Sequence, residues 1–247
     1  MEIKFLSLIF ICLICFGKSQ QACENLLNIF SDASNSLSQN HFTIQQTFIS
    51  FIIQNINTLK KVEYGKYAES DSEIIIPWNS NISKSEYINT IIQTKQWNKP
   101  VSIYRAFQEL SLAVLSDHTL HFSSIIFITD TSNDEEINRA IETYKHLLKP
   151  KVFLTLVATG EKAYVSKLAA FEVKIFDWTD LSKPYPIGWD LNVAQGCVGA
   201  MTTVTSTLAL SSTTTTPQPY IPCAGKVTIL SDTSNVLSPT NFQVNPM

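Results

Sequence analysis

Short apolar runs alternate with longer segments in which apolar residues recur at helical spacing, between about residues 25 and 176. Runs rich in β-branched and aromatic residues are typical of strands, and recurrence every three to four residues is typical of helices. This alternation predicts an α/β fold, a Rossmann-like, doubly wound, mostly parallel sheet with helices on both faces. The predicted strands cover residues 25–30, 61–67, 73–78, 123–129, 152–158 and 173–176, and the predicted helices cover residues 41–59, 83–94, 103–115, 134–148 and 162–170.

Two of the predicted strands lead into an aspartate. The run 25–30 is followed by Asp32, and the run 123–129 ends at Asp130. The carboxyl ends of parallel strands meet at one edge of a sheet, where such folds bind ligands, so the two carboxylates are predicted to approach each other. The runs 61–67 and 73–78 are close enough in sequence to be neighbours through a hairpin.

The start of the chain has the pattern of a targeting segment. Lys4 precedes an apolar run at residues 5–16, and small and polar residues follow. This pattern predicts a signal peptide at residues 1–19, cleaved from a secreted, extracellular protein. A run of about twelve apolar residues is shorter than the roughly twenty that span a bilayer. No later run is longer, so we expect no membrane span after cleavage.

Composition narrows the function classes. The chain has 247 residues, 45% of them hydrophobic, and a net charge of −3, which excludes a disordered chain and a strongly basic nucleic-acid binder. Its four histidines form no zinc-binding pattern, and there is no nucleophile elbow, dinucleotide fingerprint or phosphate loop. The sequence therefore predicts a binding protein and not an enzyme.

The cysteines indicate how the chain is divided. After signal cleavage three cysteines remain in an oxidising compartment, Cys23, Cys197 and Cys223. Cys23 and Cys197 bracket the patterned sequence, so the simplest pairing joins the ends of one domain, residues 22–197, and leaves Cys223 over. Asn81 opens the single Asn-Ile-Ser acceptor for N-glycosylation, in a predicted loop.

The sequence beyond this domain changes character. Residues 198–220 are uncharged and rich in threonine and serine, which is typical of a linker and invites O-glycosylation. Residues 222–242 repeat residues 22–42 in register, with the cysteine, Ser-Asp, Ser-Asn, Leu-Ser and the final phenylalanine all coinciding. Residues 221–247 are thus predicted to be the truncated start of a second copy of the domain.

The turn after the first strand carries candidate metal ligands. Asp32, Ser34 and Ser36 form the pattern D-x-S-x-S, and a carboxylate with two hydroxyls at alternate positions of a turn suits Mg²⁺, which prefers hard oxygen donors. Asp130 is expected to add a second carboxylate from the end of another predicted strand, because both strands end on the same edge.

Residues 22–197 resemble the von Willebrand factor type A domain, through DASNS after the first strand, the later IIFITDTSND and then VFLTLVATG. In that family a D-x-S-x-S motif, a threonine on a second loop and an aspartate on a third form a metal-ion-dependent adhesion site, which a carboxylate of the bound partner completes. The resemblance implies that Asp32, Ser34, Ser36 and Asp130 hold Mg²⁺, with Mn²⁺ or Ca²⁺ as alternatives. Several secreted members also tie the two ends of the domain with a disulfide.

The second loop departs from the family pattern. Val101 stands at the threonine position, and Ser102 follows one residue later. Either Ser102 substitutes as a ligand on a shifted loop, or the site lacks one ligand and is weak or vestigial.

The sequence thus predicts a secreted adhesion or ligand-binding module whose cation bridges to a carboxylate on an extracellular protein partner. Its Thr-rich spacer and Ile-Tyr-Arg-Ala-Phe segment are similar to those of secreted nematode proteins that join this domain, in some cases, to a C-type lectin domain, which implies a role in extracellular matrix or innate immunity. The alternative is a metal-independent structural or interaction module with a vestigial metal site.

Overall fold

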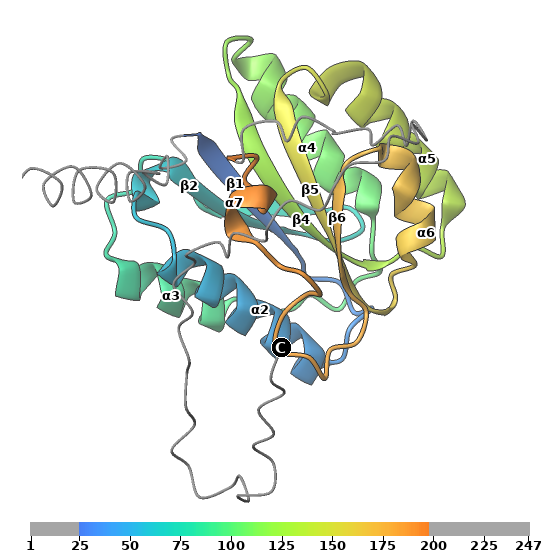
Figure 1. The fold of residues 1–247 in the computed structure, drawn as a ribbon, viewed down its shortest axis with the longest axis horizontal. Helices are drawn as coiled ribbons and strands as arrows, with labels where there is room; N and C mark the ends of the chain where they lie inside the picture. Colours follow the sequence, from blue (N-terminus) through green and yellow to red (C-terminus); the bar gives the residue numbers. More distant parts are fainter. Residues whose placement is uncertain (1–24, 198–247) are drawn as a thin grey trace, which may run out of the picture. The chain divides into compact units, whose positions relative to one another are not determined.

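The computed structural model describes residues 25–197, and within them the strands form one sheet in the order β3-β2-β1-β4-β5-β6 (Figure 1). Neighbouring strands are parallel except β2 and β3, which form the predicted hairpin and are antiparallel. The mostly parallel α/β sheet is confirmed. The strands are β1 (Leu26–Asp32), β2 (Val62–Tyr67), β3 (Ser72–Ile76), β4 (Phe122–Asp130), β5 (Val152–Lys162) and β6 (Lys174–Trp178).

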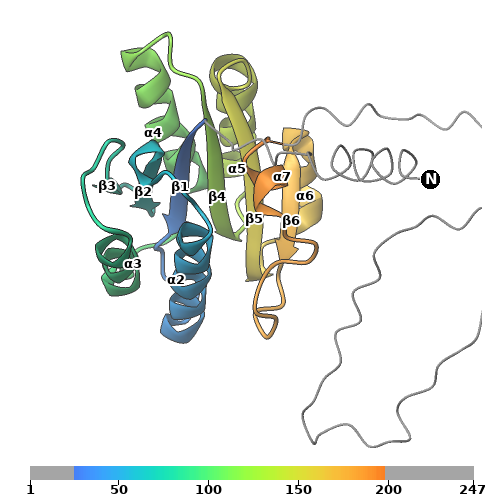
Figure 2. The same ribbon diagram turned by 60° about the vertical axis from the view of Figure 1, so that its left-hand side comes forward.

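Helices cover both faces of the sheet (Figure 2). One apolar core lies between the sheet and α4, α5 and α6, and includes Phe30, Phe107 and Ile126. A second core lies under α2 and α3 and includes Phe48 and Trp178. The helices are α2 (Gln39–Gln54), α3 (Lys84–Gln93), α4 (Ile103–Ser116), α5 (Asp134–Thr143), α6 (Val165–Leu168) and α7 (Leu191–Ala194).

Polar side chains define where the longer helices begin. Ser38, Ser83, Ser102 and Asn133 precede α2, α3, α4 and α5, and each side chain accepts a hydrogen bond from a backbone N–H of the first turn. These bonds satisfy amide groups that have no partner within the helix. Asn81 lies exposed in the loop before α3, and its glycosylation stays a prediction.

Three predicted helix boundaries differ from the structure. The helix predicted at 41–59 ends at Gln54, because the Asn55 N–H turns back to the carbonyls of Ile52 and Ile53. The helix predicted at 162–170 starts too early, because β5 continues to Lys162, whose carbonyl accepts a hydrogen bond from the Thr131 N–H at 3.0 Å. In the helix predicted at 134–148, the last part, Tyr144–Leu148, is a π-helix.

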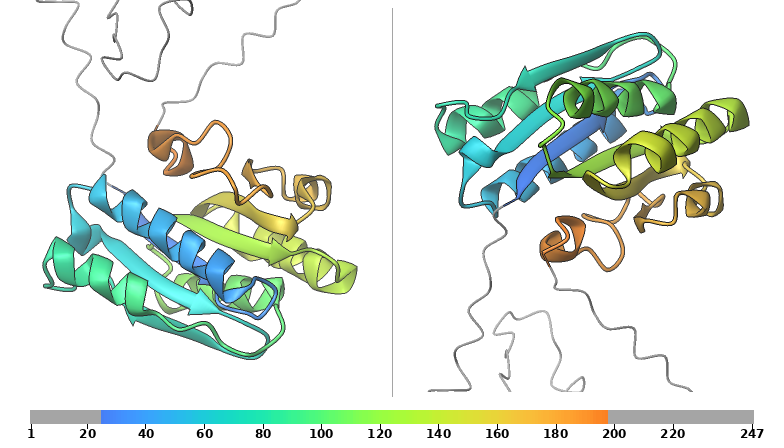
Figure 3. Two further views of the ribbon diagram at one scale, coloured as in Figure 1. Left: turned by 90° about the horizontal axis from the view of Figure 1, so that it is seen from below. Right: turned by 90° about the horizontal axis from the view of Figure 1, so that it is seen from above.

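The short helix α7, which the sequence did not predict, lies near the start of β1 (Figure 3). The Thr155 hydroxyl donates to the Ala194 carbonyl at 3.0 Å, and the Ser123 hydroxyl donates to the Gln195 carbonyl at 2.7 Å. β4 begins beside Leu26 in the sheet, so both ends of the described chain lie at the amino edge of β1 and β4.

Cys197 is disulfide-bonded, and its predicted pairing with Cys23 lies outside the described residues. The predicted signal peptide, linker and second copy also lie outside them. Within residues 25–197, none of the helices combines the length and the apolar character needed to cross a membrane.

Candidate functional site

The candidate site is built on the carboxyl ends of β1 and β4. One oxygen of the Asp32 carboxylate accepts the Ser34 N–H at 2.9 Å. The other accepts the Thr129 hydroxyl at 2.5 Å and the Thr129 N–H at 3.4 Å. Asp130 is the next residue, and its carboxylate accepts the Ser132 N–H at 2.7 Å. The two predicted aspartates therefore lie at the same edge of the sheet, linked through Thr129.

Burial makes the Asp32 carboxylate unusual. Asp32 is only 1% exposed, and this burial raises the pKa of its carboxyl group to about 6, against the lowering effect of its hydrogen bonds to Thr129 and Ser34. Among residues 25–197, no lysine, arginine or histidine forms an ion pair with it. At neutral pH an ionised carboxylate is therefore buried here with hydrogen-bond donors but without a neighbouring positive charge.

The two serines of the first loop follow directly. Ser34 is buried, and its hydroxyl oxygen accepts the Ser36 N–H at 3.3 Å, whereas Ser36 is partly exposed. The segment before α4 supports this loop: the Gln96 side chain donates to the Ser34 carbonyl at 2.5 Å, and the Lys99 carbonyl accepts the Asn35 N–H at 2.8 Å. The predicted second loop thus lies beside the first.

Ser102 lies at the start of α4 and is held by α5. Its hydroxyl donates a very short hydrogen bond to the Glu136 carboxylate, and its oxygen accepts the Arg105 N–H at 3.3 Å. Glu136 also accepts the Tyr104 N–H at 3.3 Å and pairs with Arg139 at 3.7 Å. Within the described residues, no hydrogen bond joins Ser102 to the first loop.

Val101, at the position where the family pattern has threonine, is partly buried against the core that α4 covers. It offers no oxygen to the site. Thr129 and Glu136 were not among the predicted site residues. The position of Thr129 directly before Asp130 was the available signal for the first, and the acidic first turn of α5 was the signal for the second.

A hollow of about 420 Å³ opens next to the first loop. Its lining includes Ser36, Thr129, His41, Lys162 and Asp180. Ser36 and Thr129 belong to the candidate site, so a group that reached the site would have room beside it.

No cluster of three or more histidine, cysteine, aspartate or glutamate side chains suited to a metal occurs within residues 25–197. Any cation at this edge would therefore depend on hydroxyl oxygens as well as carboxylates.

Solved structures share this fold. Proximal thread matrix protein 1 from the mussel byssus, in a form with a zinc-occupied MIDAS motif, is 16% identical with a TM-score of 0.54, over 65% of this chain and 43% of that one. A von Willebrand factor type A protein from Catenulispora acidiphila is 13% identical with a TM-score of 0.52, over 65% and 40%. Manganese-loaded TRAP protein from Plasmodium vivax is 16% identical with a TM-score of 0.51, over 66% and 74%.

These similarities identify the fold of residues 25–197 as that of the von Willebrand factor type A domain, as the sequence resemblance predicted. The chain spans about two fifths of the length of the mussel protein structures, 42% in one of them. No family model matches the sequence, and no curated protein matches it. The resemblance to secreted nematode proteins stays a prediction.

Proposed function

We propose that this protein is an extracellular ligand-binding module that uses a divalent cation to bridge to a carboxylate on a partner protein. The observation that carries the proposal is the buried Asp32 carboxylate, which has no positive charge beside it and accepts hydrogen bonds from Ser34 and Thr129 at the edge of the sheet where β4 ends in Asp130. A buried anion without a counter-charge is costly, so a bound cation would stabilise this edge.

The proposed ligands are Asp32, Ser34, Ser36 and Asp130. Oxygen donors of this kind suit Mg²⁺, Mn²⁺ or Ca²⁺. Two proteins of similar fold, one with a zinc-occupied MIDAS motif and one manganese-loaded, support a divalent cation in a domain of this fold. When bound, the cation would supply a positive centre for an incoming carboxylate, because the hydroxyl ligands are neutral and a bound water can be displaced.

We further propose that Ser102 takes the place of the missing threonine. Its proton is directed to Glu136 and its oxygen accepts the Arg105 N–H, which leaves one oxygen lone pair for another partner. A carboxylate that accepts the proton of a ligand makes the ligand a better donor, as it does in other metal sites. Glu136 would then be a positioning residue for Ser102.

This function is binding and not catalysis. The proposed partner is an extracellular protein that presents an aspartate or glutamate, and the proposal includes the secretion, disulfide and glycosylation expected from the sequence. An adhesive role in extracellular matrix or innate immunity belongs to the same proposal.

Binding of a short acidic peptide to the secreted chain tests the bridge. We expect binding measured by calorimetry with 5 mM Mn²⁺ to exceed binding in EDTA about tenfold or more, since cation and carboxylate affinities are thermodynamically linked. Asp130→Asn should abolish the increase in peptide binding that the cation causes. The control variant Asp134→Asn, in the exposed first turn of α5, should keep this increase. Equal binding with and without cation would contradict the bridge.

The second candidate is a metal-independent interaction module. Val101 favours it, because this side chain cannot ligate a cation. On this alternative the polar groups around Asp32 only support the turn, and partner binding would be the same in EDTA.

A further inference from the structure

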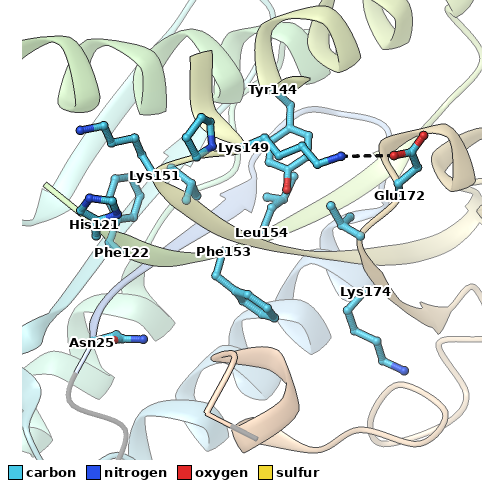
Figure 4. Close-up of a pocket in the computed structure, with 13 residues that line it drawn as sticks. Asn25, His121, Phe122, Tyr144, Lys149, Lys151, Phe153, Leu154, Glu172 and Lys174 are labelled. Atoms are coloured by element: carbon cyan, nitrogen blue, oxygen red, sulfur yellow. Dashed lines mark hydrogen bonds and ion pairs between the residues drawn. The ribbon is translucent and has the colours of Figure 1, made fainter. Parts of the chain in front are cut away.

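A second hollow lies at the opposite, amino edge of the sheet, far along the strands from Asp32 and Asp130. Its volume is about 530 Å³, within the range of ligand pockets. It lies where β4, β5 and β6 begin and where the chain turns from the π-helix into β5 (Figure 4). Its apolar lining includes Phe122, Leu154 and Val173, with Phe153, whose side chain is 45% exposed.

Lysines surround this hollow. Lys149, Lys151 and Lys174 line it, and Lys145 reaches the same acidic partner as Lys149. In Figure 4, Lys149 lies on the same side of β5 as Tyr144, and Lys174 lies on the other side with Phe153. The acidic groups beside these lysines are Glu172 and Asp117. The edge is therefore positively charged, although the whole chain carries a net charge of −3.

Glu172 shows that these lysines can hold a carboxylate. Its two oxygens lie 3.2 Å from Lys145 Nζ and 3.2 Å from Lys149 Nζ. The hydrogen bonds and charges of the two lysines lower the pKa of the Glu172 carboxyl group. The Glu172 side chain is 61% exposed, and exposed ion pairs contribute little. An incoming carboxylate could therefore replace Glu172 at small cost.

The segments of this chain outside residues 25–197 have few acidic groups to offer. Residues 198–247 contain only one acidic residue, Asp232, and one lysine. Between residues 20 and 24 the only acidic residue is Glu24. Charge complementarity therefore favours a second molecule as the source of the anion, and not the tail of the same chain.

We propose that this hollow, hereafter the amino-edge hollow, binds an acidic segment of a partner protein. An apolar side chain of the segment would lie against Phe153 and Val173, because Phe122 and Leu154 at the base of the hollow are only 3% and 2% exposed. The carboxylates of the segment would pair with Lys149, Lys151 and Lys174. The apolar lining favours a peptide over a polysaccharide, whose surface is polar. This binding needs no cation, so it is independent of the function proposed for Asp32.

The test uses the secreted chain in EDTA at low salt, with the peptide acetyl-Glu-Glu-Phe-Glu-Glu-amide as the probe. We expect amide NMR shifts at residue 149, at residues 151–154 and at residues 172–174. The double variant Lys149→Gln/Lys151→Gln should raise the Kd at least fivefold, and Glu172→Gln should lower it, because a competing carboxylate is gone. The matched control Lys183→Gln, an exposed lysine that does not line the hollow, should leave the Kd within twofold.

Three outcomes would overturn the proposal. The first is equal binding of a peptide in which glutamine replaces every glutamate, since charge would then be irrelevant. The second is a Kd that the double lysine variant does not change. The third is binding of a sulfated oligosaccharide at these lysines without binding of the peptide. Because EDTA is present throughout, none of these results bears on the cation site.

Discussion

Asp32 and Glu63 are both buried carboxyl groups, but their surroundings differ. Asp32 is bonded to donors of the loop and of β4 at the open edge of the sheet. Glu63 accepts the Asn28 amide at 2.9 Å, and Asn28 in turn accepts the Ser124 hydroxyl at 3.0 Å. This second group lies within a polar chain across β2, β1 and β4 that supports the fold.

The ionisation of Glu63 should make the protein less stable as pH rises. Burial raises the pKa of its carboxyl group to about 7, from 4.5 when unfolded. Its contribution is thus fully present below pH 4.5 and is lost as pH rises through 7. Relative to Glu63→Gln, the free energy of unfolding of the wild type should fall by up to about 3 kcal/mol as the pH rises from 4.5 to above 7. Urea unfolding at several pH values measures this change, with the exposed Glu69→Gln as the control. Parallel profiles for wild type and Glu63→Gln would contradict the assignment.

The sequence alone predicted that Asp32 and Asp130 lie at one edge of the sheet. Asp32 and Asp130 each end an apolar run, and parallel strands bring such ends to one edge. The environment of Ser102 was not predictable, because its acceptor Glu136 is 34 residues away and depends on how α4 and α5 pack.

The start of α4 carries Ser102, the hydroxyl that we propose replaces the expected threonine in the cation site. Ser102 has two roles there. It caps α4 by accepting the Arg105 N–H, and it donates to Glu136 on α5. The position of α5 therefore sets the direction of the Ser102 hydroxyl.

Glu136→Gln should weaken cation binding about tenfold, because a neutral amide is a poorer acceptor for the Ser102 proton. Glu135→Gln is the matched control. This substitution removes the same charge from the same turn, but the exposed Glu135 side chain does not contact Ser102. The cation affinity of this variant should therefore stay within twofold of the wild-type value. Calorimetry with Mn²⁺ compares the three proteins. Equal losses in both variants would mean that only net charge matters and that Glu136 does not position Ser102.

The short helix α7 is an element that the sequence pattern could not predict. Four residues give too little periodicity. The helix is held by the Asp190 cap and by burial of Ala194, and hydroxyls of distant strands bond the carbonyls at its end. Thr155→Val removes the donor to the Ala194 carbonyl. We expect a loss of about 1–3 kcal/mol in unfolding free energy, with faster hydrogen exchange at residues 191–197. Thr159→Val, whose hydroxyl bonds within β5, is the control. Unchanged exchange in Thr155→Val would contradict this account of α7.

At the scale of the whole molecule, the two edges of the sheet have different chemistry. The carboxyl edge carries the buried Asp32 with hydroxyls and Asp130, and the amino edge carries lysines around an apolar hollow. The fold itself was largely predictable, because each strand and each longer helix has a clear apolar period. The charge difference between the edges was not, because Lys149 and Lys174 reach the same edge only in the folded sheet.

The disulfide expected to close the domain is tested by peptide mapping. The ends of the described chain lie at the same edge, and Cys197 is disulfide-bonded. We expect a non-reducing digest to link the peptides of Cys23 and Cys197, and reduction to lower stability by about 4–5 kcal/mol, as for the closure of a long loop. A link between Cys197 and Cys223 would contradict the predicted pairing.

We propose that the carboxyl edge binds a divalent cation through Asp32. Calorimetric titration of Mg²⁺ and Mn²⁺ into the wild type and Asp32→Asn tests it most directly, with urea unfolding in EDTA to establish that the variant is folded. Asparagine keeps the shape of the side chain and an oxygen to accept the Ser34 N–H. We predict saturable binding with one site per chain in the wild type, and none in the folded variant. No binding by the wild type, or the same binding by both proteins, would contradict the account.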